Sequence, residues 1–218
     1  MTGVALYKVL DYNRRSTSGD KGQWPELPNW TEPVSGRLHL YTGYHLYTII
    51  GLVYNIGPTI WEAETGEEFI SFLPYRVVAR TARLIRRIQA WDKRNAVIFA
   101  CDCVEHCLRQ VQGPDDAFLL VEEIRDVALG KSGEKALEDV YATAGIIWNR
   151  EKSLPAQAAV SAVRNIASYK VYGKTVWGSI AKALEAARTA IEYLEGEYAY
   201  YEEGGWQARH LQSILEVK

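Results

Sequence analysis

Three cysteines and a histidine lie close together in the chain, and their types suit zinc binding: Cys101, Cys103, His106 and Cys107. Thiolate and imidazole groups are common ligands of zinc. On a helix that turns about 100° per residue, Cys103, His106 and Cys107 fall on one face, whereas Cys101 joins an apolar stripe. A closed four-ligand site would therefore need a ligand from another element. We expect the cysteines to be small core residues, and we predict no bound metal and no cofactor.

Two other groupings have residue types that suit general acid–base chemistry. Asp102 and His106 are four residues apart, so the carboxylate could orient the imidazole on a helix, but no nucleophile is marked beside them and we expect an ion pair. In the N-terminal part, His45 lies among tyrosines, and Glu62 and Glu64 share one face of a later strand. An enzyme that uses His45 with Glu62 or Glu64 in a site between two domains is therefore an alternative function. The other interpretation is an aromatic mini-core with solvated glutamates.

A cluster of cations between residues 80 and 94 could hold an anion such as phosphate. Six Lys or Arg residues stand there against one acid, and the candidate anion patch consists of Arg80, Arg83 and Arg87. Single-strand nucleic-acid sites interleave aromatic residues with cations, whereas only Trp91 does so here. Nucleic acid is therefore not favoured as a partner. We expect these cations to be solvated or paired with acids of the chain, such as those of residues 185–203.

A stripe of tyrosines and glutamates is the strongest candidate for a partner surface. Residues 177–203 predict one long helix with an apolar seam at spacings of three and four. On its opposite side lie the residues of this stripe, which are Tyr193, Glu197, Tyr200 and Glu203. Tyrosine rings supply contact area and carboxylates steer the approach of a basic protein. Packing of the stripe on the first domain or on a second copy, as in a homodimer, remains the alternative.

The amino-acid composition of the chain, which determines the elements that position these residues, changes near residue 80. Residues 1–80 hold 3 of the 24 alanines and 5 of the 7 prolines, whereas residues 81–218 hold the other 21 alanines. Alanine favours helices, and proline marks turns and loops. The sequence therefore predicts an α+β fold, with a small β-rich N-terminal domain over 1–86 and an α-helical bundle of five or six helices over 87–218.

Alternating residues predict strands at 3–10 and 37–41, and Thr48 can cap a short helix that ends before Gly57. A hairpin is expected from strands 59–64 and 67–72 around Thr65–Gly66, while 77–84 suits either a strand or a helix and we favour a strand. Helical periodicity then continues, and it predicts helices over about 92–111, 115–129, 132–148, 153–172, 177–203 and 206–217.

The charge and the apolar runs exclude several classes of protein. The net charge is −2 and neither part of the chain is strongly basic, so no broad field attracts nucleic acid or an anionic membrane. The most apolar run, residues 46–54, is far shorter than the roughly 20 residues that span a bilayer. The N-terminus lacks the apolar core of a signal peptide, and three clustered cysteines do not suggest a disulfide framework. We therefore expect a cytoplasmic protein without a membrane partner.

Several motifs resemble two known families. AWDKRNAVIFACDCVEHCL at 90–108, PDD at 114–116, the helix end ALG and WQARHLQSIL at 206–215 are similar to an alanine-rich immunity protein family, over about residues 85–218. Upstream, YKVLD at 7–11, GYHLY at 43–47 and IWEAE at 60–64 resemble an uncharacterised bacterial and phage domain. The first resemblance implies a bacterial protein that binds and blocks a toxin.

The leading functional hypothesis is therefore a non-enzymatic protein-binding module, with a toxin as the partner that the resemblance implies. Two alternatives belong to other classes. One is the enzyme with an interdomain site described above. The other is an oligomeric scaffold that assembles through the seam of the long helix.

Overall fold

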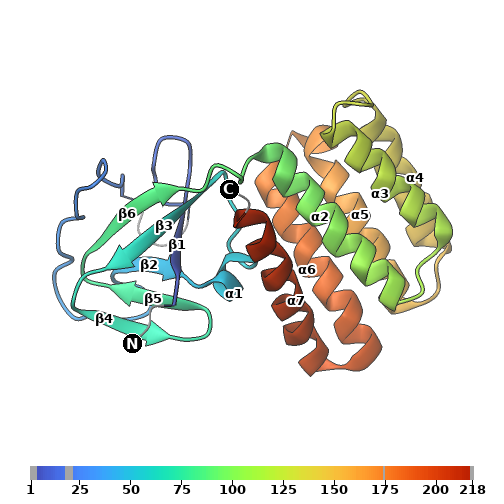
Figure 1. The fold of residues 1–218 in the computed structure, drawn as a ribbon. Helices are drawn as coiled ribbons and strands as arrows, with labels where there is room; N and C mark the ends of the chain where they lie inside the picture. The colour runs from blue at the N-terminus through green and yellow to red at the C-terminus, as the bar shows by residue number, and fades with distance from the viewer. Residues whose placement is uncertain (1–3, 18–21, 174, 217–218) are drawn as a thin grey trace. The chain divides into compact units, whose positions relative to one another are not determined.

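The computed structural model describes residues 4–17, 22–173 and 175–216. The chain divides into two compact units (Figure 1). The sheet unit holds the residues up to Asp92 and those from Leu211, and the helical unit spans Lys93–His210. Among the residues that the structure describes, a six-stranded antiparallel sheet precedes the helical region, so the predicted α+β class is confirmed. The division between the units follows Asp92, and the residues from Leu211 at the end of the last helix belong to the sheet unit.

The sheet has the strand order β4-β5-β2-β1-β3-β6, and all of its paired strands are antiparallel. Its strands are β1 (Leu6–Leu10), β2 (Tyr44–Tyr47), β3 (Thr59–Thr65), β4 (Phe69–Phe72), β5 (Arg76–Ala79) and β6 (Ala82–Arg87). A short helix, α1 (Ile49–Leu52), follows β2, and the Thr48 hydroxyl caps it by accepting from the Gly51 amide, as predicted. The expectation of strand rather than helix at 77–84 is confirmed by β5 and β6.

The predicted hairpin turn at Thr65–Gly66 is wrong. β3 pairs with β6 and β4 pairs with β5, so 59–72 and 76–87 are the two arms of a bent hairpin. Its turn lies at residues 73–75, where the Tyr75 amide donates to the Phe72 carbonyl. Gly66 instead allows the arms to approach, because a Cβ there would lie 2.2 Å from the Thr81 hydroxyl.

The predicted strand at 37–41 is also wrong, since a tight turn occupies this segment. The His39 and Thr42 backbones bond to each other, and the His39 ring accepts from the Tyr41 amide. The strand begins after Gly43, whose φ of +138° and close approach to Val78 exclude a side chain. The local polar side chains therefore outweigh the alternating pattern.

One face of the sheet forms the core of the sheet unit. Its buried residues are Leu10, Trp24, Leu46, Ala63, Ala82 and Leu84. The side chain of Lys8 is fully buried on this face, where its ammonium donates to the His45 carbonyl and lies over the Trp24 ring. The opposite face carries Tyr7, which stands between Tyr47 of β2 and Glu62 of β3.

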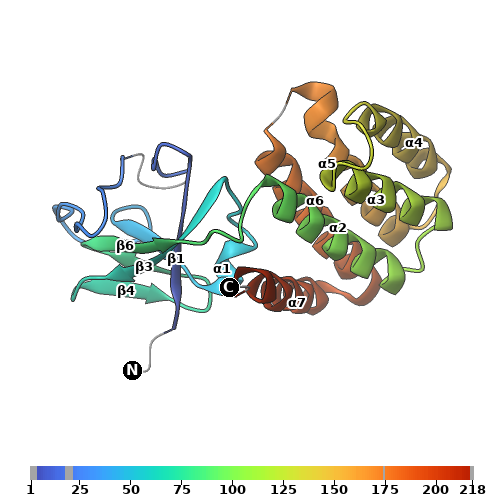
Figure 2. The same ribbon diagram turned by 45° about the horizontal axis from the view of Figure 1, so that its top comes forward.

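Within the described residues, six helices follow the sheet, and Figures 1 and 2 show how they lie beside one another. They are α2 (Lys93–Gln110), α3 (Asp115–Ala128), α4 (Ala136–Arg150), α5 (Leu154–Tyr172), α6 (Val176–Glu195) and α7 (Glu197–Leu215). The predicted helices over 92–111, 115–129, 132–148 and 153–172 are confirmed within a few residues. In the described ranges, no helix is both long enough and apolar enough to cross a membrane.

The predicted long helix over 177–203 is wrong, because it breaks at Gly196. This residue has φ +97° and ψ 177°, a conformation that ends α6 and that side chains rarely adopt. The predicted helices over 177–203 and 206–217 leave a break at Gly204 and Gly205, but these two residues lie inside α7. The seam of α6 is buried as predicted from Ile180 to Ile191, whereas Trp177 before it is half-buried and Leu194 beyond it is exposed.

Candidate functional site

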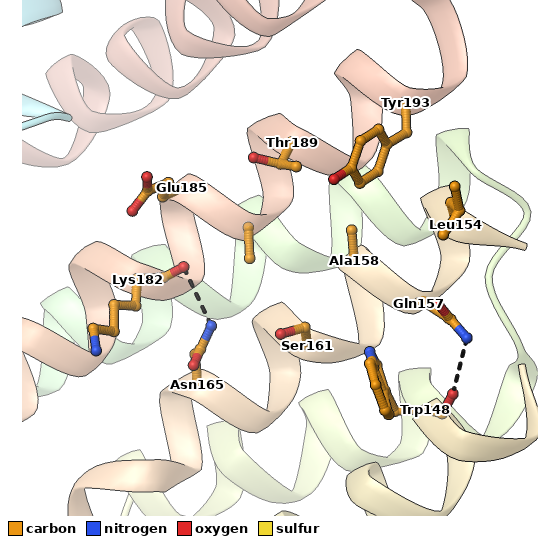
Figure 3. A pocket seen from close by; sticks show the side chains of 11 residues that line it. Trp148, Leu154, Gln157, Ala158, Ser161, Asn165, Lys182, Glu185, Thr189 and Tyr193 are labelled. Atoms are coloured by element: carbon orange, nitrogen blue, oxygen red, sulfur yellow. Dashed lines mark hydrogen bonds between the residues drawn. The ribbon is translucent and has the colours of Figure 1, made fainter.

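An open groove of about 490 Å³ lies along α5 and α6, next to the end of α4 (Figure 3). Small buried residues on the inner faces of the two helices, such as Ala159, Ala162 and Ala183, allow their backbones to approach. The Asn165 amide donates to the Lys182 carbonyl across the groove at 3.4 Å. The floor of the groove is therefore set by direct packing of α5 on α6.

The connection between α4 and α5 positions one end of the groove. Ser153 caps α5 by accepting from the Ala156 amide. The Gln157 side chain donates to the carbonyls of Glu151 at 2.6 Å and of Trp148 at 3.5 Å. These bonds hold the last turn of α4 against the first turn of α5, and so they place the Trp148 backbone at the edge of the groove.

The two ends of the groove differ in chemistry (Figure 3). One end of the groove is lined by Trp148, Leu154 and Tyr193. Their exposed fractions are 39%, 61% and 56%, in that order. Lys182 and Glu185 lie at the other end, with Asn165 between them and the middle of the groove. An exposed aromatic and aliphatic cluster rimmed by polar residues is typical of a protein-interaction surface.

An acidic and aromatic tip continues from this apolar end around the connection of α6 and α7. The exposed apolar residues of the tip are Leu194, Tyr198 and Tyr201, of which Tyr198 is 87% exposed. Three exposed glutamates stand among them, at 195, 197 and 202. The only cation from residue 185 to 203 is Arg188, and it is buried. The tip therefore presents negative charge and aromatic rings to the solvent.

The predicted stripe of Tyr193, Glu197, Tyr200 and Glu203 is not one surface. Tyr193 belongs to α6 and the other three residues to α7, because the break at Gly196 resets the helical phase. Tyr193 and Glu197 are exposed, but Tyr200 is half-buried beneath the Arg188 guanidinium, which lies 5.3 Å from the ring centroid. Glu203 is buried, so the expectation that it is exposed is wrong.

Glu203 belongs to a polar network between α2, α6 and α7. The Gln207 amide donates to Glu203 at 3.2 Å and its carbonyl accepts from Arg188 at 2.7 Å. His106 lies 3.4 Å from the Glu203 carboxylate and stacks on Trp206 with ring centroids 3.7 Å apart. Burial raises the pKa of Glu203 to about 7, although the Gln207 bond and the Arg188 charge oppose this.

The residues first considered for zinc or general-base chemistry are dispersed in the helical unit. All three cysteines are fully buried, and burial raises the pKa of each thiol. Asp102 bonds to His210 at 2.9 Å and to Arg125 at 3.0 Å, so the predicted pair with His106 is wrong. In the ranges that the structure describes, no three His, Cys, Asp or Glu side chains are grouped as metal ligands.

The acid–base candidates of the sheet unit lie on separate strands. His45 is buried on β2, whereas Glu62 and Glu64 are on β3, with β1 between the two strands. At about 4.8 Å per strand, β2 and β3 are about 10 Å apart, and the pairing registers offset His45 from both glutamates along the strands as well. Glu62 accepts two bonds from Arg86, at 2.5 and 2.8 Å, and Glu64 pairs with Arg83. The carboxylates are therefore engaged by arginines rather than by His45.

The arginines of the predicted anion patch are mostly occupied within the sheet unit. Arg80 donates to the Glu68 carboxylate at 2.5 and 2.6 Å and also to backbone carbonyls. The hydrogen bonds from Arg80 lower the pKa of Glu68. Arg83 pairs with Glu64 and lies over the Trp30 ring. The Nε atom of Arg87 is buried without a hydrogen-bond partner in the described part of the chain. Acids of the sheet unit, rather than those of residues 185–203, therefore pair with Arg80 and Arg83.

Sequence reasoning missed Trp148 and Leu154, which form the apolar end of the groove. The apolar periodicity that predicts the helix over 132–148 includes both Ile147 and Trp148, but of the two only Ile147 is buried in the structure. A signal was present, because Trp148 lies at the edge of the apolar stripe and Leu154 directly follows the Ser153 cap. Large apolar residues in these positions are more exposed than residues in the middle of a stripe.

The fold and the groove define a two-unit α+β protein with an open, amphipathic surface site. Comparisons of the chain with family models, curated proteins and solved structures give no match. The function is therefore inferred from the chemistry of the site itself.

Proposed function

We propose that this chain is a non-enzymatic protein-binding module whose groove and acidic tip hold a basic, amphipathic segment of a partner protein. The observation that carries the proposal is the exposed cluster of Trp148, Leu154 and Tyr193 at one end of the groove. Aromatic residues of this kind contribute most of the binding energy in protein interfaces. A helix of the partner would place its apolar side on this cluster.

The charge of the tip indicates which partner fits. The exposed glutamates at 195, 197 and 202 attract cations, and no exposed Lys or Arg of residues 183–203 opposes them. Such a surface speeds the approach of a basic partner and repels an acidic one. The preferred partner is therefore a protein segment with lysines or arginines beside apolar residues.

The resemblance to alanine-rich immunity proteins suggests that the partner is a toxin. A toxin that acts on an anionic substrate carries a basic surface, and the acidic tip would cover it. Blocking requires only tight binding, so this function does not depend on any catalytic group in the chain.

The two alternative functions receive less support from the geometry. A scaffold would need the seam of α6 on its outside, but Ile180, Leu184 and Ile191 are buried within the chain. The enzyme hypothesis needs His45 beside Glu62 or Glu64, and β1 separates them.

The experiment is affinity capture from the native host, followed by a binding measurement with the purified partner. Trp148→Ala and Tyr193→Ala should each weaken binding by about tenfold or more, as loss of an aromatic anchor does. Tyr12→Ala is the matched control, because this tyrosine is 66% exposed and belongs to the sheet unit. Unchanged binding by both groove variants, or an equal loss in the control, would contradict the proposal.

A further inference from the structure

The sheet unit contains a second pocket, of about 390 Å³, that is separate from the groove. It lies between α1 and the ends of β2, β4 and β5, which Figure 1 labels. The residues that matter for its chemistry are Tyr47, Tyr54, Asn55, Phe72, Tyr75 and Arg76. The volume is within the range of about 300–1,000 Å³ that is usual for small-molecule sites.

Two hydrogen bonds hold the walls of this pocket together. The Thr48 amide donates to the Tyr75 carbonyl at 3.0 Å, and the Asn55 side chain donates to the Gly51 carbonyl at 2.9 Å. Gly51 lies directly against the strand turn, since a Cβ there would be 1.9 Å from the Tyr75 carbonyl oxygen. Helix α1 is thus held against the start of β5, and little rearrangement is needed for binding.

Four of the eight lining residues are aromatic. The rings of Tyr54 and Tyr75 meet edge to face, with centroids 5.6 Å apart and planes at 85°. Phe72 is partly exposed beside them, whereas Tyr47 is nearly buried. Rings in this arrangement offer both a face and an edge, and a planar ligand can stack on the one and meet the other.

Arg76 gives the pocket a positive charge that no acid of the described chain neutralises. Among the described residues, its guanidinium makes one polar contact, with His45 Nδ1 at 3.5 Å. Arg80 and Arg86 of the same sheet each hold a glutamate through two hydrogen bonds. A half-buried guanidinium without such a partner is suited to a carboxylate or phosphate, which it can bind through two parallel bonds.

We propose that this pocket binds a small planar ring that carries one acid group, with the ring on Tyr54 and Tyr75 and the acid on Arg76. The ring fills the apolar lining, and the acid supplies the counter-charge that the guanidinium lacks. This inference is independent of protein binding by the groove, because every lining residue of the pocket belongs to the sheet unit.

The test is calorimetry and ligand-detected NMR on the full chain with benzoate, 4-hydroxybenzoate and indole-3-carboxylate. At least one acid should bind saturably in the millimolar range or tighter, and phenol and acetate, which lack the acid or the ring, should bind about tenfold more weakly or not at all. Absence of saturable binding by all three acids, or equal binding of phenol, would overturn the proposal.

Variants separate the contribution of the charge from that of the rings. Arg76→Gln should weaken acid binding by about tenfold, and Arg76→Lys should restore part of it, because the charge returns without the fork. Arg86→Gln is the control, since Arg86 pairs with Glu62, and it should leave binding unchanged. If Arg76→Gln does not fold, Tyr54→Leu gives the same test through the ring. Unaltered affinity in a folded Arg76→Gln or Tyr54→Leu variant would refute the site.

Discussion

Glu203 carries a carboxyl group into the interior of the helical unit, and this should make the free energy of unfolding depend on pH. Burial raises its pKa from 4.5 to about 7 in the folded chain. One pKa unit corresponds to about 1.4 kcal/mol, so the ionised carboxylate should make the folded state about 3 kcal/mol less stable than the protonated form does. Between pH 4.5 and 7 the folded chain holds a proton that the unfolded chain has released. Stability should therefore fall as the pH rises through this range.

His106 contributes in the opposite direction, because burial lowers its pKa below 6.5 and disfavours its charged form in the folded chain. Its contribution rises with pH, so the wild-type curve alone does not isolate Glu203. Glu203→Gln removes the titrating group and keeps an oxygen that accepts from the Gln207 amide. The variant should match the wild type near pH 4.5 and exceed its stability by up to about 3 kcal/mol at pH 8.

The assay is urea denaturation of both proteins at several pH values from 4.5 to 8, with Glu202→Gln as the control. Glu202 is the neighbouring residue of α7 and is exposed, so its variant has the same change of charge without burial. The control should show a small difference from the wild type that varies little with pH. A stability difference between Glu203→Gln and the wild type that stays constant with pH would refute the assignment of Glu203 as a buried titrating group.

Two further predictions concern the interior of the helical unit. Leu184 is fully buried on the seam of α6, so Leu184→Ala should cost about 2–5 kcal/mol in chemical denaturation, whereas Lys182→Ala on the exposed face should be nearly neutral. Equal costs would show that the seam is assigned to the wrong face. Elemental analysis of the purified protein should find no stoichiometric zinc, because burial disfavours the thiolate forms of the cysteines. About one zinc per chain that is lost in Cys103→Ser would contradict this.

The sequence predicts the elements best where one periodicity continues without interruption. Ile180, Leu184, Ala187 and Ile191 repeat at spacings of three and four, and all are buried in α6. The turns are harder to predict from the sequence, because their positions depend on contacts with residues that are distant in the chain. Thr65–Gly66 has the composition of a hairpin turn, yet Gly66 serves a close approach to Thr81 in the other arm. No local pattern reveals that requirement.

The end of α6 shows a different limit of the sequence pattern. Gly196 is flanked by glutamates that favour helices, whereas the pair Gly204–Gly205 looks like the stronger break. The structure ends the helix at Gly196 through a backbone conformation that suits glycine, and it tolerates the pair inside α7. An error of eight residues in the break then changes which side of α7 faces inward.

This change explains why the candidate surface was misplaced. A prediction from apolar periodicity assumes that the apolar residues of a helix face inward. Helix α7 does not follow this assumption, because Glu203 and Gln207 are buried whereas Tyr198 and Tyr201 are exposed. The buried pair is compatible with the interior because Arg188 and the Gln207 amide satisfy it through hydrogen bonds. Of the exposed tyrosines, Tyr198 is 87% exposed, and Tyr201 meets the Tyr200 ring edge to face with centroids 5.5 Å apart. Conflicts between a local pattern and the fold concentrate at functional sites, and here the conflict lies beside the groove that we assign to the partner protein.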